Sequence, residues 1–131
     1  MATKQLLLID DDEDTRTLVE LALKMKNPEW EVVTASDGIE GITKAETERP
    51  DVILLDFIMS GLDGLTVCEV LKSNLFTCSI PVIFITAMAH SKVFSQLENS
   101  LAEGIITKPF DVVNLDSQIT KIIDNNKILA K

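Results

Sequence analysis

The sequence contains few of the residues that mark several common classes of protein. Its two cysteines, Cys68 and Cys78, form no C-x-x-C pair and are too few for a cysteine metal site. We expect both to be reduced thiols. No apolar stretch approaches the roughly 20 residues of a membrane-spanning helix, and the apolar run after Lys4 stops early, at Asp10. We therefore expect no signal peptide, no membrane partner and a cytoplasmic location.

Basic side chains are also scarce. There are 12 Lys and Arg residues against 21 Asp and Glu residues, which gives a net charge of −9. Binding to a nucleic-acid backbone depends on clustered Lys and Arg, and here these residues are scattered without interleaved aromatics. We therefore expect no direct binding of nucleic acid.

What the sequence does contain is an alternation of short apolar runs and helical segments. Its 131 residues, 46% of them hydrophobic, suffice for one domain with one core. We predict strands at residues 5–9, 30–35, 52–55, 81–85 and 104–107. Helices are predicted at residues 12–26, between 36 and 49, at 64–73 with Asp63 as N-cap, at 90–98, and after a last cap at Asp111.

Apolar residues at helical spacing predict which side of each helix is buried. Gly41 weakens the second helix. The residues expected to face inward are Leu18, Leu21, Ala22 and Met25 in the first helix, Ile39, Ile42 and Ala45 in the second, Val93, Phe94 and Leu97 in the fourth, and Val112, Leu115, Ile119 and Ile122 in the last.

Five consecutive strand–helix pairs indicate an α/β fold, with a parallel sheet covered by helices on both faces. Right-handed crossovers leave few arrangements. We predict one doubly wound, flavodoxin-like (βα)5 domain over residues 1–131, with a core at about 4–123, a polar tail and strand order 2-1-3-4-5. The switch point then lies between strands 1 and 3, where ligands of open α/β sheets bind.

Polar side chains follow four of these strands. Asp10 and Asp11 end the first, Asp56 the third, Thr86 the fourth and Lys108 the fifth. Because the carboxyl ends of parallel strands share one edge of a sheet, we expect these residues to form one site.

The expected site suits a metal ion and a phosphoryl group. Neighbouring carboxylates repel unless some are protonated or a cation lies among them. Mg²⁺ is usually held by one or two carboxylates, waters and phosphate oxygens. A carboxylate can also act as a nucleophile and form an aspartyl phosphate, a transfer that depends mainly on positioning and charge neutralisation. Lys108 would supply positive charge, and Thr86 a hydrogen bond to a phosphoryl oxygen.

Four motifs occur in order: LIDDD at 8–12 with Arg16, PDVILLD at 50–56 followed by Met59 and Asp63-Gly64, ITA at 85–87, and TKPF at 107–110. In order and spacing the chain resembles the receiver domain of two-component response regulators, of the stand-alone, chemotaxis-regulator kind. The resemblance covers essentially the whole chain. The start Met and the polar tail at 124–131 favour a stand-alone receiver over an excised domain.

The resemblance implies a role for each site residue. Asp56 would accept the phosphoryl group. Mg²⁺ would be held directly by Asp11, Asp56 and the backbone carbonyl of Ile58, and indirectly or weakly by Asp10. Thr86 would bind a phosphoryl oxygen.

The resemblance also implies that Lys108 would pair with the phosphoryl group and that the Lys108–Pro109 bond would be cis. The donor would be a sensor histidine kinase or a histidine phosphotransfer protein. The domain would catalyse only its own phosphorylation and dephosphorylation, and an unidentified downstream protein would read the switched surface. The family's common partner surface, formed by the fourth helix, the fifth strand and the fifth helix, offers Phe94, Leu97 and Leu101.

The chain departs from the family's pattern at several positions. Ser60 stands where Pro is usual, which predicts a less rigid loop. Ile105 stands where an aromatic often changes rotamer, so readout would have to use the packing of Ile105. Leu101 replaces a common Gly. Ile58 and Met88 are apolar where polar groups help to position a hydrolytic water, which predicts slow self-dephosphorylation.

Other functions fit the residues less well. A phosphatase of the haloacid dehalogenase type needs a second Asp two residues after the first, and Ile58 stands there. A flavin-binding flavodoxin needs a Ser/Thr/Gly-rich phosphate loop, whereas residues 10–13 are acidic. A receiver that binds partners without phosphorylation remains open. The lone His90, beside a loop, is expected to be a surface residue.

Overall fold

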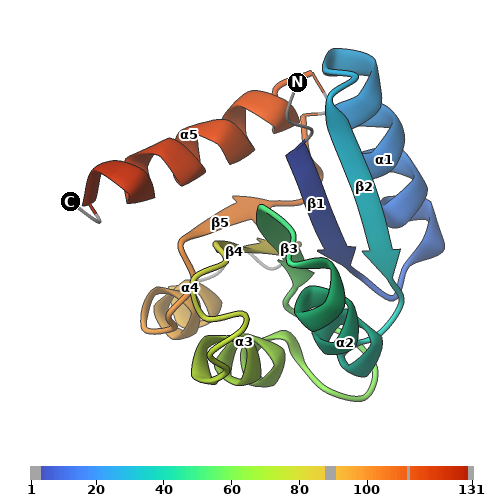
Figure 1. The fold of residues 1–131 in the computed structure, drawn as a ribbon. Coiled ribbons are helices and arrows are strands. Elements are labelled where there is room, and N and C mark those ends of the chain that lie inside the picture. The colour runs from blue at the N-terminus through green and yellow to red at the C-terminus, as the bar shows by residue number, and fades with distance from the viewer. Residues whose placement is uncertain (1–3, 88–90, 112, 130–131) are drawn as a thin grey trace.

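Strands and helices alternate along the chain in the computed structural model, which describes residues 4–87, 91–111 and 113–129 (Figure 1). The elements are β1 (Lys4–Ile9), α1 (Glu13–Lys26), β2 (Trp30–Ala35), α2 (Gly38–Glu48), β3 (Val52–Asp56), α3 (Gly64–Ser73), β4 (Val82–Thr86), α4 (Ser91–Glu98), β5 (Gly104–Thr107) and α5 (Leu115–Leu129).

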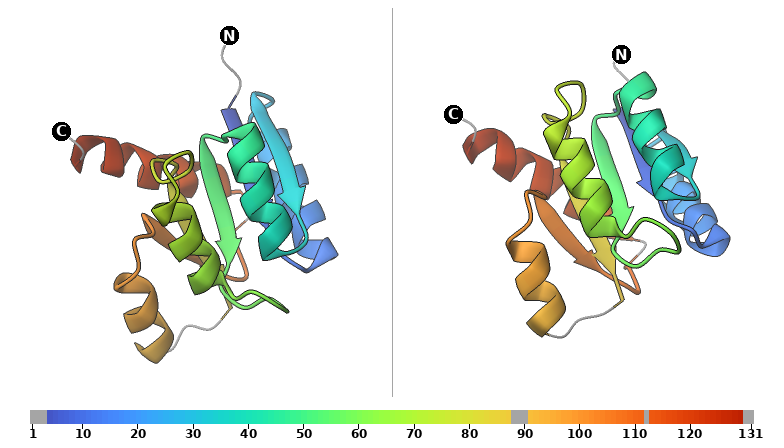
Figure 2. Two further views of the ribbon diagram at one scale, coloured as in Figure 1. Left: turned by 60° about the horizontal axis from the view of Figure 1, so that its bottom comes forward. Right: turned by 90° about the horizontal axis from the view of Figure 1, so that it is seen from below.

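The strands form one parallel sheet in the order β2-β1-β3-β4-β5, which confirms the predicted topology. Ile9, the last residue of β1, pairs with Leu55 of β3, so Asp10, the first residue after β1, lies level with Asp56, the last residue of β3. The strand arrowheads in Figure 2 point to one edge of the sheet, the edge at which the loops after β1 and β3 begin.

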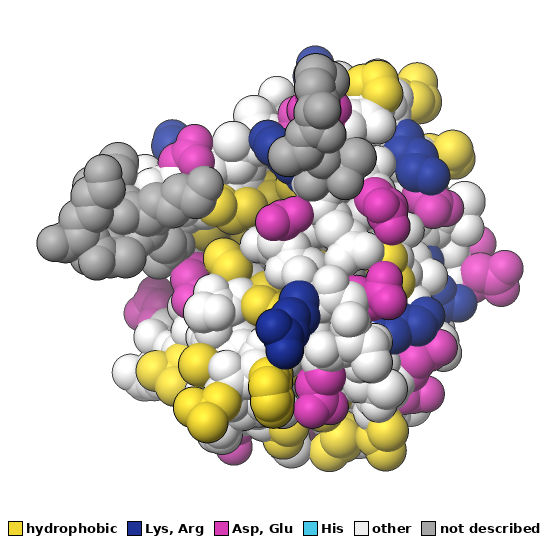
Figure 3. All heavy atoms as spheres, in the orientation of Figure 1, with side chains coloured by type: hydrophobic (Ala, Val, Ile, Leu, Met, Phe, Trp, Pro, Cys, Tyr) yellow, Lys and Arg dark blue, Asp and Glu magenta, His cyan; other side chains and the backbone are white. Residues whose placement is uncertain are grey.

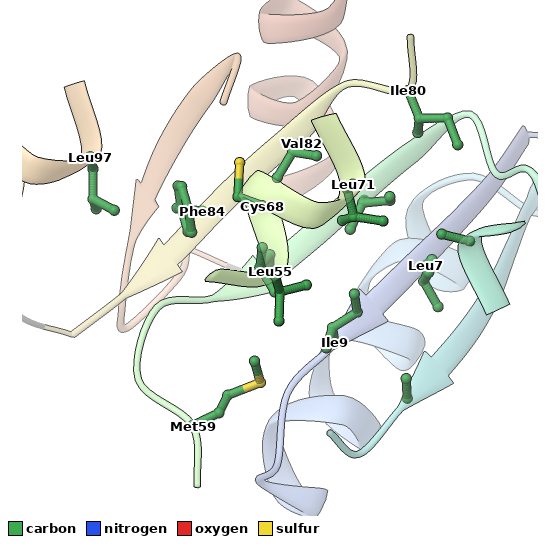
Figure 4. Close-up of a cluster of buried hydrophobic side chains, with 14 residues drawn as sticks. Leu7, Ile9, Leu55, Met59, Cys68, Leu71, Ile80, Val82, Phe84 and Leu97 are labelled. Atoms are coloured by element: carbon green, nitrogen blue, oxygen red, sulfur yellow. The ribbon is translucent and has the colours of Figure 1, made fainter. Parts of the chain in front are cut away.

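Two layers of helices cover the sheet. Figure 2 shows α2 and α3 side by side in front of it and α1 behind it. Successive side chains of a strand point to opposite faces, so each strand contributes to two apolar clusters. Leu7, Ile9, Leu55, Phe84 and other strand residues pack with Ala45, Val67, Cys68, Leu71 and Leu97 of α2, α3 and α4 (Figure 4). Leu6, Leu8, Leu54, Ile83 and others pack with Val19, Leu23, Leu115 and Ile119 of α1 and α5.

The prediction for the buried face of α1 was wrong. Leu18, Leu21 and Met25 are 46%, 56% and 84% exposed, whereas Val19 and Leu23 are fully buried. Apolar residues extend around more than half of this helix, so periodicity allowed two faces. The contacts of α1 with β2 and α5 select the face with Val19 and Leu23.

The second helix also differs from its prediction. Ile39, expected to face inward, is 68% exposed. Gly41 is buried, and a Cβ added there would lie 2.5 Å from the Cδ1 atom of Ile9. Gly41 therefore allows α2 to approach β1, a benefit that offsets its low helix propensity.

The predicted start of the last helix was wrong. The helix begins at Leu115, and Asp111 instead holds a turn, in which its side chain accepts the N–H of Val113 and its carbonyl that of Asn114. Leu115 and Ile119 are buried as predicted, and Ile122 is half-buried. Val112 and the side chains of Val93 and Phe94 lie outside the described part of the chain.

Candidate functional site

Three carboxylates meet at the sheet edge where they were predicted. One carboxylate oxygen from each of Asp10, Asp11 and Asp56 lies within 4.8 Å of the others. Asp10 is fully buried, Asp56 is 7% exposed, and Asp11 is exposed. The site thus has two buried acidic groups and one that faces solvent.

Hydrogen bonds to the side chain and to the backbone carbonyl of Asp10 hold this residue in place. Its Oδ1 atom accepts the N–H of Asp12 at 2.9 Å. Its backbone carbonyl accepts a bond from Nη1 of Arg16, in α1, at 2.7 Å. Asp12 is the N-cap of α1, accepting the N–H of Asp14. The start of α1 is therefore tied to the end of β1, which carries the acidic pair.

Lys108 brings a positive charge to the two buried carboxylates. Its Nζ atom lies 3.1 Å from Oδ2 of Asp10 and 3.6 Å from Oδ2 of Asp56. The Lys108–Pro109 peptide bond is cis, as the resemblance implied. The N–H of Lys108 donates to the carbonyl of Thr86 at 2.8 Å, so the ends of β4 and β5 are joined beside the site. Thr86 is 1% exposed.

The surroundings of Asp56 disfavour its ionised form. Burial, and next the negative charge of Asp10, raise the pKa of Asp56 from 3.8 to about 7, although Lys108 and the N–H of Ile58 act in the opposite direction. One ammonium does not balance three adjacent carboxylates. A hard divalent cation would relieve this repulsion, and carboxylate oxygens are ligands that such cations prefer. The donor set therefore fits Mg²⁺.

The loop after β3 packs into the core beside the site. Phe57, next to Asp56, packs edge-to-face against Phe84. Met59 is 8% exposed and reaches from this loop towards the core cluster (Figure 4). A Cβ added at Gly64 would lie 2.5 Å from the carbonyl oxygen of Asp56, so only glycine allows α3 to begin this close to the phosphoacceptor candidate.

Two contacts at this site were not predicted from the sequence. Ser60 donates from its N–H and its hydroxyl to Oδ2 of Asp11, at 3.0 and 3.2 Å. The signal was present in the replacement of the usual Pro by a residue with two donors. Arg16 was noted only as part of a motif, because a side-chain bond to a backbone carbonyl leaves no trace in sequence spacing.

The structure describes only some of the residues that were expected to influence the lifetime of the phosphoryl group and the readout of phosphorylation. Ile58 is 54% exposed beside Asp56. Ile105 is half-buried and packs against the cluster that contains Phe84 and Leu97. Met88 and His90 lie outside the described residues. Cys68 is buried and Cys78 exposed, and both are free thiols, as expected.

A doubly wound sheet of order β2-β1-β3-β4-β5, with an acidic cluster and a lysine at the switch point between β1 and β3, defines a flavodoxin-like domain with a charged site at its ligand-binding edge. A family model described as "Response regulator receiver domain" matches residues 6–120. The chain belongs to this family and is a receiver domain of two-component response regulators.

Curated relatives and solved structures agree with this assignment. The chain is 36% identical to the alkaline phosphatase synthesis transcriptional regulatory protein PhoP of Bacillus subtilis, over 97% of this chain and 51% of PhoP. It is 35% identical to the DNA-binding dual master transcriptional regulator RpaA of Synechocystis, over 91% of this chain and 48% of RpaA. The chain thus spans about half the length of these relatives.

Among solved structures, the chemotaxis protein CheY4 of Vibrio cholerae superposes with a TM-score of 0.84 at 26% identity, over 92% of this chain and 99% of CheY4. Within the part of the chain that the structure describes, no helix is long and apolar enough to cross a membrane.

Proposed function

We propose that Asp56 accepts a phosphoryl group from a phosphohistidine and that the resulting aspartyl phosphate switches a protein-binding surface. The observation that carries this proposal is the position of the Lys108 ammonium, 3.1 Å from Asp10 and 3.6 Å from Asp56. This cation, beside a buried carboxylate at a sheet edge, is suited to hold the charge that a transferred phosphoryl group brings.

The chain's own residues would supply orientation and charge. An oxygen of Asp56 forms the new O–P bond while the P–N bond to the donor imidazole breaks, and the imidazole nitrogen leaves with the electron pair and takes up a proton. Lys108 would pair with the phosphoryl oxygens while it remains next to Asp10. Thr86, buried at the end of β4, donates its hydroxyl to one of these oxygens.

We propose that Mg²⁺ is held by Asp11, Asp56 and the backbone carbonyl of Ile58, with Asp10 acting indirectly or weakly. When bound, Mg²⁺ neutralises negative charge on the carboxylates and on the transferring phosphoryl group. Asp10, fully buried and bonded to Lys108, keeps the ammonium at the site in either state. Asp11, which is exposed, is the carboxylate that faces an arriving cation.

The proposed partners follow from this chemistry. A sensor histidine kinase or a histidine phosphotransfer protein would donate the phosphoryl group, and a downstream protein would bind the phosphorylated form. Leu101, 71% exposed after α4, is available for such a contact, whereas Leu97 is a core residue at 2% exposure. We propose that the chain works as one cytoplasmic receiver unit and turns over no substrate besides its own phosphoryl group.

We propose no direct binding of nucleic acid by this chain. The net charge is −9, and on the face shown in Figure 3 Lys and Arg side chains are scattered, with acidic side chains distributed over the same face. The DNA-binding relative named above is about twice as long as the segment it shares with this chain.

The test is the intact mass of the protein after exposure to a small phosphodonor, with and without Mg²⁺. The mass should rise by one phosphoryl group only with Mg²⁺, and Asp56→Asn should abolish the gain. Asp51→Asn is the matched control, because Asp51 is exposed and its Oδ2 atom bonds the N–H of Gln5, at the other end of β1. An unchanged mass in the presence of Mg²⁺ would contradict the proposal and favour a receiver that binds partners without being phosphorylated.

A phosphatase of the haloacid dehalogenase type is the enzymatic alternative. Such an enzyme needs an acid two residues after its nucleophile, and that position holds Ile58, which is apolar and 54% exposed. Steady release of phosphate from excess phosphomonoester would favour the phosphatase, whereas a single transfer to protein favours the receiver.

A further inference from the structure

The loop after the phosphoacceptor candidate is fastened to the neighbouring acidic residue by two hydrogen bonds. Ser60 donates from its backbone N–H to Oδ2 of Asp11 at 3.0 Å and from its hydroxyl to the same oxygen at 3.2 Å. The two residues are 49 positions apart in the sequence. The contact therefore joins the loop after β3 to the loop after β1 at the proposed metal site.

The serine is held firmly enough to orient its partner. Met59, the preceding residue, is 8% exposed and packed in the core. Ile58, one residue earlier, donates its N–H to the carboxylate of Asp56. Three successive residues of this loop thus anchor it to Asp56, to the core and to Asp11.

Asp11 depends on such a contact more than its neighbours do. It is exposed, whereas Asp10 and Asp56 are buried among other groups. An exposed carboxylate loses side-chain freedom when it binds a cation. Both donors act on Oδ2, and a carboxylate has about four lone-pair sites, so the held side chain still has oxygen lone pairs for a metal ion.

We propose that Ser60 is a positioning residue that holds Asp11 ready for Mg²⁺ before the ion arrives. This proposal rests on the Mg²⁺ site proposed above. The residue usual at this position in the family, Pro, has neither an N–H nor a hydroxyl, so a receiver with that Pro lacks both hydrogen bonds. It also links the cation to the β3–α3 loop: loss of the Ser60 contact weakens Mg²⁺ binding without removing a ligand.

The first experiment needs no metal. In ¹⁵N–¹H NMR spectra of chelator-treated protein, the amide resonance of Ser60 should move when Asp11 is changed to Ala, because its N–H loses a charged acceptor. Asp51→Ala, which removes an exposed carboxylate at the other end of the sheet, should leave the Ser60 resonance in place. A Ser60 amide that does not respond to Asp11→Ala would overturn the proposal.

The second experiment measures Mg²⁺ affinity by titration calorimetry. Ser60→Ala, which keeps the backbone donor, should weaken binding about 3- to 10-fold, and Ser60→Pro, which removes both donors, about 10- to 100-fold, the usual range for partners of metal ligands. Ser60→Thr should retain near-native affinity. The matched control is Ser79→Ala, an exposed serine just before β4, at the opposite edge.

The outcomes separate the two proposals. If the native chain binds Mg²⁺ and Ser60→Ala and Ser60→Pro bind it equally well or more tightly, the role of Ser60 is wrong while the metal site stands. If the native chain binds no Mg²⁺, the proposed metal site fails and the role of Ser60 fails with it. NMR spectra that match the native pattern outside the site identify variants that remain folded.

Discussion

At the scale of the residue, Asp56 shows how the fold changes the chemistry of a side chain. It is 7% exposed, lies next to fully buried Asp10, and has a pKa raised from 3.8 to about 7 by burial and by that neighbour. In the metal-free protein, ionising a carboxylate in this environment costs free energy, and a bound cation would reduce that cost. The same arrangement that destabilises the charge prepares the residue for metal-dependent chemistry.

This cost predicts the pH dependence of stability without metal. Between pH 3.8 and about 7 the folded protein retains a proton on Asp56 that the unfolded chain has released. The free energy of unfolding therefore falls as the pH rises through this window. Asp56→Asn should flatten this part of the pH profile and raise stability at pH 7.5 by about 1–3 kcal/mol. Urea unfolding in the presence of a chelator measures both effects, and a variant whose profile parallels the native one would contradict the assignment.

The apolar side chain of Ile58 predicts a long-lived phosphoryl group. It is 54% exposed beside Asp56 and offers no polar atom to orient water. Exchanging Ile58 for Asn together with Met88 for Glu should speed loss of the phosphoryl group about tenfold, a modest share of what a positioned polar group supplies. The decay is followed by intact mass after removal of the donor. No acceleration would refute this explanation of lifetime.

At the scale of the element, the helices show which predictions sequence pattern supports. The third helix begins and ends where it was predicted. Its start is set by Asp63, which accepts the N–H of Thr66 as an N-cap does. The prediction of the buried face of α1 was wrong, because a helix that is apolar over more than half of its circumference does not specify which side is buried. The choice is made by packing against β2 and α5, which no local pattern encodes.

The corrected face of α1 predicts opposite outcomes for two leucines on the same helix. Leu23 is fully buried and Leu21 is 56% exposed. Leu23→Ala should lower the free energy of unfolding by about 2–4 kcal/mol, and Leu21→Ala by less than about 0.5 kcal/mol. Urea denaturation of both variants decides the point, and comparable losses would mean that the face is misassigned.

At the scale of the whole molecule, the parallel topology brings distant residues into one site. The strand order and the meeting of Asp10, Asp11, Asp56 and Lys108 followed from the alternation of elements and from the rule that ligands bind at the switch point. The contacts of Ser60 and Arg16 did not follow, because they depend on loop paths. The fold and the main site residues can thus be predicted from the sequence, whereas the groups that orient those residues can be identified only from the three-dimensional structure.

The whole molecule should be stabilised by the cation that its site is proposed to hold. At a Mg²⁺ concentration about 100 times Kd, binding adds about 2.7 kcal/mol to the free energy of unfolding. Chelation should remove this gain. Asp51→Asn should gain as much as the native chain, and Asp11→Asn and Asp56→Asn should gain much less. Equal stabilisation of all four proteins would show that the ion acts elsewhere.

The most direct test of the central claim locates the phosphoryl group. The protein is phosphorylated with a small donor and Mg²⁺, digested under conditions that preserve acyl phosphates, and its peptides are identified by mass. The phosphoryl group should be found on the peptide that contains Asp56, and on no other. A phosphoryl group on Asp10, Asp11 or His90, or its complete absence, would contradict the assignment of Asp56 as the phosphoacceptor.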